Sequence, residues 1–251
     1  DYIFQFHRVT YHAVVTHQGA AAHKGTMANL RFLIHNTRPV DPRCGSNLCT
    51  FGDPNVLAWM IKLLGGNPEG TKIITCHIGN GSSISAVRGG KCMDTSMGFT
   101  PLDGIMMGTR CGSIDPAIIP YLMRKGEITT ADDIDKMMNK KSGMLGVSGK
   151  TSDNQEIGKL AEAGDERAIL CEKMYSHQIA KFVGSYIACM GGTDAIVFTG
   201  GIGENSYDVR ETVCESLTYL GLELDKEFNK EHAHIKGNDY RISTDASKVA
   251  V

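Results

Sequence analysis

The stretch Ile73–Gly81 reads IITCHIGNG, and it decides the fold class of this chain. Its β-branched and apolar start predicts a short strand, which runs without a break into a segment containing Gly79 and Gly81. Glycine there lets backbone N–H groups approach a ligand, because no side chain blocks them. The pattern predicts an α/β fold with a phosphate-binding junction, and an ordinary Gly-Asn-Gly hairpin is the alternative.

A second strand runs into glycines near the end of the chain. Residues 195–198 form a buried-type strand, and Thr199–Asn205 follows as TGGIGEN before an expected helix over 206–220. The N-terminus of such a helix is suited to anionic or polar groups. The spacing fits no dinucleotide fingerprint, because Ser206 stands where its third glycine should be.

The other nucleotide motif that can be tested is the P-loop. Gly149, Lys150 and Thr151 resemble its end, but Met144 stands where its first glycine is required, and no strand precedes it. The sequence therefore predicts neither an ordinary mononucleotide fold nor a dinucleotide fold.

The remaining elements follow from periodicity and capping signals. Thr130 and Asp133 predict a capping box at the start of one helix. Helices are expected over residues 57–64, 115–124, 130–140, 156–163, 165–189 and 206–220, and further strands over 82–87, 91–94 and 239–243.

Composition limits the class of protein. The 251 residues carry a net charge of −2, which favours neither nucleic acid nor an anionic membrane as a partner, and no apolar run is long enough for a membrane span. The eight cysteines are scattered without a Cys-x-x-Cys pair, and no secretory leader is visible, which favours reduced thiols and a cytoplasmic location. Residues 1–60 stay unassigned as an irregular or poorly specified segment, although their histidines raise metal binding as a disfavoured alternative.

A third glycine-rich cluster contains an arginine. Arg110 lies in MGTRCG (107–112), shortly after DTSMGFTPL (94–102). An arginine between glycines is suited to hold a phosphoryl group with two parallel hydrogen bonds. The alternative is a structural ion pair with Asp94 or Asp115.

Together, IITCHIGNG (73–81), DTSMGFTPL (94–102), MGTRCGSIDP (107–116) and FTGGIGEN (198–205) closely resemble the acetate kinase family, part of the actin-like superfamily of acetate and sugar kinases. The resemblance covers about residues 63–251 and corresponds to the second, nucleotide-binding half of such an enzyme. It implies a ribonuclease-H-like domain, a mixed sheet flanked by helices, over residues 61–251. It also implies reversible, Mg²⁺-dependent phosphoryl transfer from ATP to acetate, giving acetyl phosphate and ADP, and a homodimer.

The resemblance implies roles for individual residues. Arg110 corresponds to the arginine that stabilises the transferring phosphoryl group and binds the acetate carboxylate, and Pro101 to part of the pocket for the acetate methyl group. Both glycine segments are expected to line one nucleotide cleft. The implied ATP-binding residues are His77, Ile78, Gly79, Asn80 and Gly81 around the phosphates; Ser152, Asp153, Asn154 and Gln155 near the adenine; and Gly200, Gly201, Ile202, Gly203 and Glu204 beside the adenosine and α-phosphate.

The chain also departs from the family pattern. Asn154 and Gln155 follow Asp153 where the family has an arginine, and residues 49–53 stand where it has His-Gly-Thr-Ser-His. No metal-contacting residue is identifiable, and the family's first domain and its late glutamate are expected to lie outside the chain. Two alternatives therefore stay open, a nucleotide-binding fragment without turnover and a propionate or butyrate kinase.

Overall fold

The structure, a computed structural model, describes residues 60–62, 64–232 and 240–251. These residues belong to one compact unit, Leu48–Val251. Residues 1–59, which are nearly all of the unassigned segment 1–60, lie outside the described residues, as do residues 57–59 and 63 of the helix expected over 57–64. The assignment of residues 61–251 to a nucleotide-binding domain stays a prediction.

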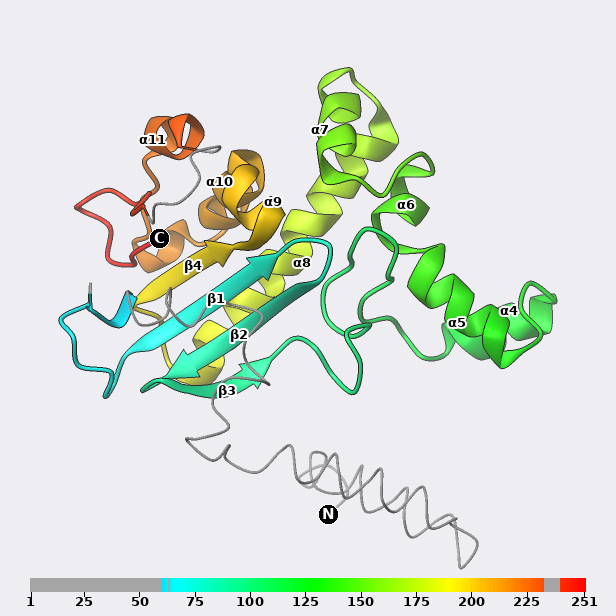
Figure 1. Cartoon of the computed structure of the whole chain (residues 1–251), viewed down its shortest axis with the longest axis horizontal. Coiled ribbons are helices and arrows are strands. Elements are labelled where there is room, and N and C mark those ends of the chain that lie inside the picture. Colours follow the sequence, from blue (N-terminus) through cyan, green and yellow to red (C-terminus); the bar gives the residue numbers. More distant parts are fainter. Residues whose placement is uncertain (1–59, 63, 233–239) are drawn as a thin grey trace, which may run out of the picture. The chain divides into compact units, whose positions relative to one another are not determined.

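A four-stranded mixed sheet forms the centre of the unit, with the strand order β3-β2-β1-β4 (Figure 1). The first three strands form an antiparallel meander, and the last strand returns parallel to β1. The strands are β1 (Lys72–Ile78), β2 (Ser82–Arg88), β3 (Lys91–Thr95) and β4 (Ala195–Thr199).

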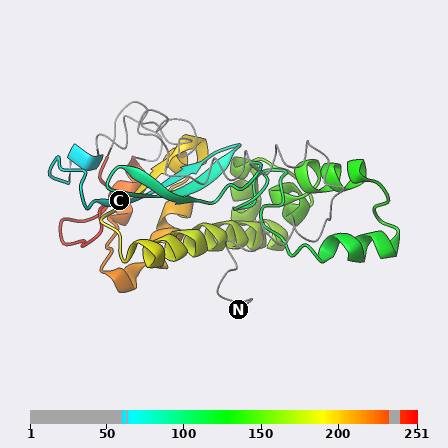
Figure 2. The same ribbon diagram turned by 90° about the horizontal axis from the view of Figure 1, so that it is seen from below.

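Helices connect β3 to β4 and follow β4. The longest, α8, runs along one face of the sheet (Figure 2). The described helices are α4 (Ile118–Lys125), α5 (Ala131–Lys140), α6 (Gly143–Ser148), α7 (Asn154–Glu162), α8 (Glu166–Met190), α9 (Gly200–Asn205), α10 (Tyr207–Glu215) and α11 (Lys226–Glu231), with a short 3-10 helix, η2 (Thr218–Leu220).

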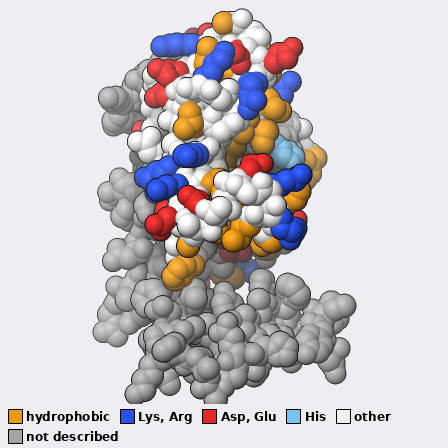
Figure 3. All heavy atoms as spheres, turned by 90° about the vertical axis from the view of Figure 1, so that its right-hand side faces the viewer, with side chains coloured by type: hydrophobic (Ala, Val, Ile, Leu, Met, Phe, Trp, Pro, Cys, Tyr) orange, Lys and Arg blue, Asp and Glu red, His pale blue; other side chains and the backbone are white. Residues whose placement is uncertain are grey.

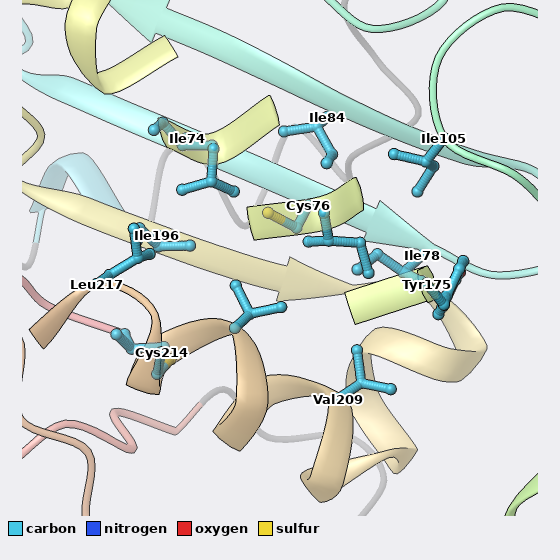
Figure 4. Packing of buried hydrophobic residues seen from close by; sticks show 14 of the residues in the cluster. Ile74, Cys76, Ile78, Ile84, Ile105, Tyr175, Ile196, Val209, Cys214 and Leu217 are labelled. Atoms are coloured by element: carbon cyan, nitrogen blue, oxygen red, sulfur yellow. The ribbon is translucent and has the colours of Figure 1, made fainter. Parts of the chain in front are cut away.

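The core follows from the alternation of side chains along the strands. Ile74, Cys76 and Ile78 of β1 are fully buried on the face that packs against α8 and α10 (Figure 4). Ile73 lies on the opposite face, where it packs with Met60. Burial of each such isoleucine stabilises the fold by about 1.5–3 kcal/mol. Buried apolar side chains therefore lie on both faces of β1.

One capping prediction is confirmed in full. Thr130 Oγ1 accepts a hydrogen bond from the N–H of Asp133, and the Asp133 side chain accepts from the N–H of Thr130, at the start of α5. The hydrogen bonds of Asp133 also lower the pKa of its carboxyl group to about 2. Local sequence was sufficient here, because the box involves residues three positions apart.

Three expected elements are wrong in extent. The helix expected over 115–124 begins only at Ile118, because residues 116 and 117 form a turn before it. The helix expected over 206–220 ends at Glu215, because the chain turns to bury Leu217 and continues only as the short η2. The strand expected over 239–243 is a single bridge between Ser243 and Leu224. Ile242 instead donates its N–H to the carbonyl of Val251, so this segment pairs with the end of the chain.

The prediction of reduced thiols holds at most of the described cysteines. Cys92 is disulfide-bonded, so the prediction is wrong at that position. The free thiols belong to Cys76, Cys111, Cys171, Cys189 and Cys214.

None of the described helices combines the length and the apolar character needed to cross a membrane.

Helix α4 differs from the central helices because none of its residues is buried. Ile118, Tyr121 and Met123 are among the exposed large hydrophobic side chains. Figure 3 shows the face at this end of the unit, where hydrophobic side chains are scattered among charged ones. The helix therefore offers apolar surface without burying it in the described part of the chain.

Candidate nucleotide site

The two glycine segments meet at one edge of the sheet. β1 and β4 are parallel neighbours, and their register pairs His77 with Thr199, so both strands end at the same edge (Figure 1). A Cβ atom placed on Gly79 would lie 3.6 Å from the backbone nitrogen of Gly201. The expectation that the segments lie close in space is confirmed.

The second segment is a helix rather than the expected loop. α9 begins at Gly200, directly after β4, where φ is +80°. A Cβ at Gly200 would lie 2.8 Å from the carbonyl oxygen of Ile78, which is too close for any other residue. The sharp turn from strand to helix therefore depends on glycine at this position. The Gly200 N–H donates to Glu204 Oε1 at 2.9 Å, so the helix supplies its own N-terminal acceptor.

Two glycines in these segments leave open space beside the backbone. Apart from the adjoining backbone, no heavy atom of the described residues lies within 4 Å of the position that a Cβ would take on Gly81 or on Gly201. Asn80 between the strands is exposed, whereas the side chain of Ile78 is fully buried in the core. Ile78 can therefore offer a ligand its backbone only, and the open backbone lies at Gly81 and Gly201.

The side chain of His77, near the end of β1, contacts the last residue of β4. Its Nδ1 lies 2.8 Å from Oγ1 of Thr199, a residue 122 positions later in the sequence. The ring is half-buried, and this burial lowers its pKa below the ordinary value of 6.5, while the Glu204 carboxylate acts in the opposite direction. Thr199 was not predicted as a site residue, and its only sequence signal is its place at the end of a buried strand.

A buried arginine fixes the far end of α9. Arg210 Nη1 donates to the carbonyls of Gly203 and Glu204, each at 2.8 Å. Its Nε donates to Oδ1 of the fully buried Asn229 at 2.6 Å. These bonds hold the last carbonyls of the helix and so set its position against the sheet. No sequence pattern links Arg210 with Asn229.

The segment expected near the adenine lies beside the end of α9. Asp153 caps α7 by accepting from the N–H groups of Gln155 and Glu156. Asn154 Nδ2 then donates to Oγ of Ser206, the residue that follows α9, at 2.9 Å. This contact joins the segment to the second glycine segment. Ser152, Asp153 and Gln155 are exposed.

Arg110 lies in a turn that is closed by a hydrogen bond to its own carbonyl oxygen. Met107 donates its N–H to the carbonyl of Arg110 at 3.0 Å, and Nη1 of the half-buried side chain lies 3.5 Å from Met107 Sδ. Among the ion pairs of the described residues, Arg110 has none with either Asp94 or Asp115. The structural ion pair is therefore not observed, and within the described residues the guanidinium contacts the sulfur of Met107.

Helix α8 ties the Arg110 turn to the first glycine segment. Gln178 Oε1 accepts from the N–H of Met106 at 2.7 Å, just before the turn. One turn earlier on the helix, Tyr175 Oη lies 3.4 Å from Oγ of Ser82, just after Gly81. A Cβ on Gly108 would also lie 3.0 Å from the carbonyl oxygen of Ser152. Contacts thus connect the Arg110 turn to two of the expected ATP-binding segments.

Pro101 is exposed in the segment that follows β3. Two hydrogen bonds from Ser113 join this segment to the Arg110 loop. Ser113 Oγ donates to Oδ1 of Asp103 at 2.6 Å, and the N–H of Ser113 donates to the carbonyl of Gly104 at 2.8 Å. Pro101 and Arg110 therefore lie in adjoining loops. Pro101 is exposed, like the neighbouring Phe99.

Residues 56–251 match the model of the acetokinase family. The chain belongs to this family. It is 50% identical over 190 residues to an acetate kinase of Bacteroides thetaiotaomicron, and the aligned region covers 76% of this chain and 47% of the relative. It is 52% identical over 189 residues to an acetate kinase of Methanosarcina thermophila, covering 75% of this chain and 45% of that relative. The chain thus spans about half the length of the curated relatives it matches.

Solved structures support the same assignment of fold. The acetate kinase of Porphyromonas gingivalis superposes with a TM-score of 0.73 at 46% identity, covering 78% of this chain and 48% of that one. A propionate kinase from Francisella tularensis superposes with a TM-score of 0.70 at 37% identity, covering 86% and 52%. The predicted actin-like, ribonuclease-H-like fold with a mixed sheet flanked by helices is therefore confirmed. The roles of the individual site residues stay predictions.

The described residues contain no group of three or more histidine, cysteine, aspartate or glutamate side chains that could hold a metal ion. In kinases Mg²⁺ is usually held by one or two carboxylates together with the phosphates of the nucleotide. The exposed Glu204 is the carboxylate that the two glycine segments contain. A dedicated metal cage does not fit these residues.

Proposed function

We propose that this part of the chain binds ATP and ADP as the nucleotide-binding half of an acetate kinase. The reaction is reversible phosphoryl transfer from ATP to acetate, which gives acetyl phosphate and ADP. The observation that carries the proposal is the meeting of Gly79–Gly81 with α9 at the shared end of β1 and β4. The open backbone at Gly81 and Gly201 supports the binding of phosphates, which a Cβ atom in that space would obstruct.

Phosphoryl transfer requires little covalent chemistry from the protein, so the residues act by positioning and by charge stabilisation. We assign His77–Gly81 to the phosphates, α9 to the adenosine and α-phosphate, and Ser152–Gln155 to the adenine side. The bond between Asn154 and Ser206 supports a common site for the last two segments. Mg²⁺ would enter with the phosphates of the nucleotide.

Arg110 would stabilise the charge of the phosphoryl group during transfer and bind the acetate carboxylate. No carboxylate of the described residues pairs with this guanidinium, which supports this role. Pro101, in the adjoining loop, would contact the methyl group of acetate. In-line transfer also needs both reactants held at near-attack distance, which requires groups beyond those described.

We further propose a homodimer in the cytoplasm, with ATP, ADP and acetate or acetyl phosphate as small-molecule partners and no nucleic acid or membrane partner. The exposed apolar side chains of α4 support self-association. Light scattering of the purified chain tests this part. A monomer at high micromolar concentration contradicts it.

A propionate kinase is the second candidate, since one of the superposed structures carries that name. A chain that binds nucleotide without turnover is the third, since the relatives are about twice as long. An acyl-phosphate assay with acetate and propionate separates the first two. Nucleotide binding without acyl phosphate formation supports the third.

Calorimetric titration with ATP and ADP tests the nucleotide site directly. Gly201→Val should weaken binding, because the side chain would enter space that the protein leaves open at that position. Gly184→Val in α8 is the matched control, because its Cβ also meets no atom within 4 Å and the position lies outside the glycine segments. No heat and no thermal shift with millimolar nucleotide, or equal effects of the two substitutions, would overturn the assignment.

A further inference from the structure

Thr199 stands at the N-cap position of α9 but does not cap the helix. Its backbone is extended, with φ −139° and ψ 172°, as is usual for an N-cap residue. A threonine there normally accepts a hydrogen bond from an N–H of the first turn. The Thr199 side chain makes no such bond. Its Oγ1 lies 2.8 Å from Nδ1 of His77 instead.

The helix has another acceptor for its first N–H. Glu204 Oε1 accepts from Gly200 at 2.9 Å, so the start of α9 does not depend on the threonine hydroxyl. Thr199 is also 7% exposed, and its β-branched side chain has restricted rotation about χ1. The hydroxyl is therefore held rigidly in the strand and directed to the imidazole.

The direction of this hydrogen bond decides which ring nitrogen carries the proton. Burial favours the neutral imidazole because it lowers the pKa of His77, and Glu204 is the charged group whose field opposes this effect. A neutral imidazole has one donor nitrogen and one acceptor nitrogen. If Nδ1 accepts from Thr199, then Nε2 carries the hydrogen.

We propose that Thr199 is a positioning residue, whose hydroxyl donates to His77 Nδ1 and so fixes the imidazole as the Nε2–H tautomer. A neutral His77 can then donate a hydrogen bond to a phosphoryl oxygen. The reverse tautomer would direct the lone pair of Nε2 at that oxygen and repel it. This inference rests on the proposed function, since it takes His77 as a phosphate contact.

Two substitutions separate the hydroxyl from the shape of the side chain. Thr199→Val keeps the branched shape and the strand propensity but removes the hydroxyl, whereas Thr199→Ser keeps the hydroxyl. Two-bond ¹H–¹⁵N correlation spectra of the labelled 251-residue chain at pH 8 report the tautomer. The His77 signals are assigned by their loss in His77→Gln.

The expected result is an Nε2–H tautomer in the wild-type chain and in Thr199→Ser, and loss of this preference in Thr199→Val. ATP binding by Thr199→Val should be about 3- to 10-fold weaker, the range for one neutral hydrogen bond, and binding by Thr199→Ser should change less than about twofold. A residue that only supports the strand would not change the tautomer.

An Nδ1–H tautomer in the wild-type chain overturns the proposal, and so does an unchanged tautomer in Thr199→Val. If Thr199→Val does not fold, as judged by circular dichroism, the wild-type tautomer and Thr199→Ser still decide the question. If the wild-type chain binds no ATP, the proposed function fails, and the tautomer result still tests the bond between Thr199 and His77.

Discussion

Replacement of Gly200 by alanine should destabilise the protein, because two penalties act at the start of α9. The backbone has φ +80°, a left-handed conformation that costs an L-residue about 1–2 kcal/mol. The added Cβ would also lie 2.8 Å from the carbonyl oxygen of Ile78 and 3.1 Å from its carbonyl carbon, and overpacking of this kind costs about 1–3 kcal/mol. The expected loss in the free energy of unfolding is therefore about 2–5 kcal/mol.

Thermal unfolding followed by circular dichroism measures this effect. At about 2–4 °C per kcal/mol for a chain of this size, Tm should fall by at least about 4 °C in Gly200→Ala. Gly201→Ala is the matched control, because its Cβ meets no atom within 4 Å and alanine favours a helix by about 0.5–1 kcal/mol. Its Tm should stay the same or rise. Equal Tm values for both variants and the wild type would refute the strand-to-helix turn described here.

Three further predictions concern catalysis, pH and the buried arginine. Arg110→Ala should change little in the isolated chain, whereas the same change in a full-length relative should lower turnover at least about 10³-fold in a hydroxamate assay; robust activity of the isolated chain would contradict this. Asp133 has a folded-state pKa of about 2, below its unfolded value, so its stabilisation of α5 is present above roughly pH 4 and lost as the pH falls towards 2. The Tm difference between wild type and Asp133→Asn should therefore shrink over this range, and a constant difference would contradict the assignment. Arg210→Met should lower the free energy of unfolding in urea by about 2–4 kcal/mol, because it leaves buried carbonyls and Asn229 without their donor; a loss below about 0.5 kcal/mol would contradict that role.

Local sequence was sufficient for features that depend on near neighbours. The capping box of Thr130 and Asp133 spans three positions, and the β-branched run that predicts β1 and the alternation that predicts β2 each lie within the strand. The glycine segments could be found because each follows its strand directly. These features were predictable because short-range propensity and side-chain period act before any long-range contact forms.

Other local predictions were incomplete because packing decided between conformations of similar local energy. TGGIGEN has three glycines and a poor helix propensity, yet Gly200–Asn205 is helical, since Arg210 holds its last carbonyls and Glu204 accepts its first N–H. The expected helix over 206–220 stops early because Leu217 is drawn into the core. Neither outcome follows from the residues of the segment alone.

The four strands of the sheet, the positions of the glycines and membership of a family of known fold therefore follow from the sequence alone. Only the tertiary structure brought His77 beside Thr199, Arg210 onto α9 and Asn154 onto Ser206. The physical reason is distance along the chain. The parallel pairing of β1 with β4 joins residues 122 positions apart, and such a contact forms only when burial of the sheet against α8 and α10 offsets the entropy of closing so long a loop.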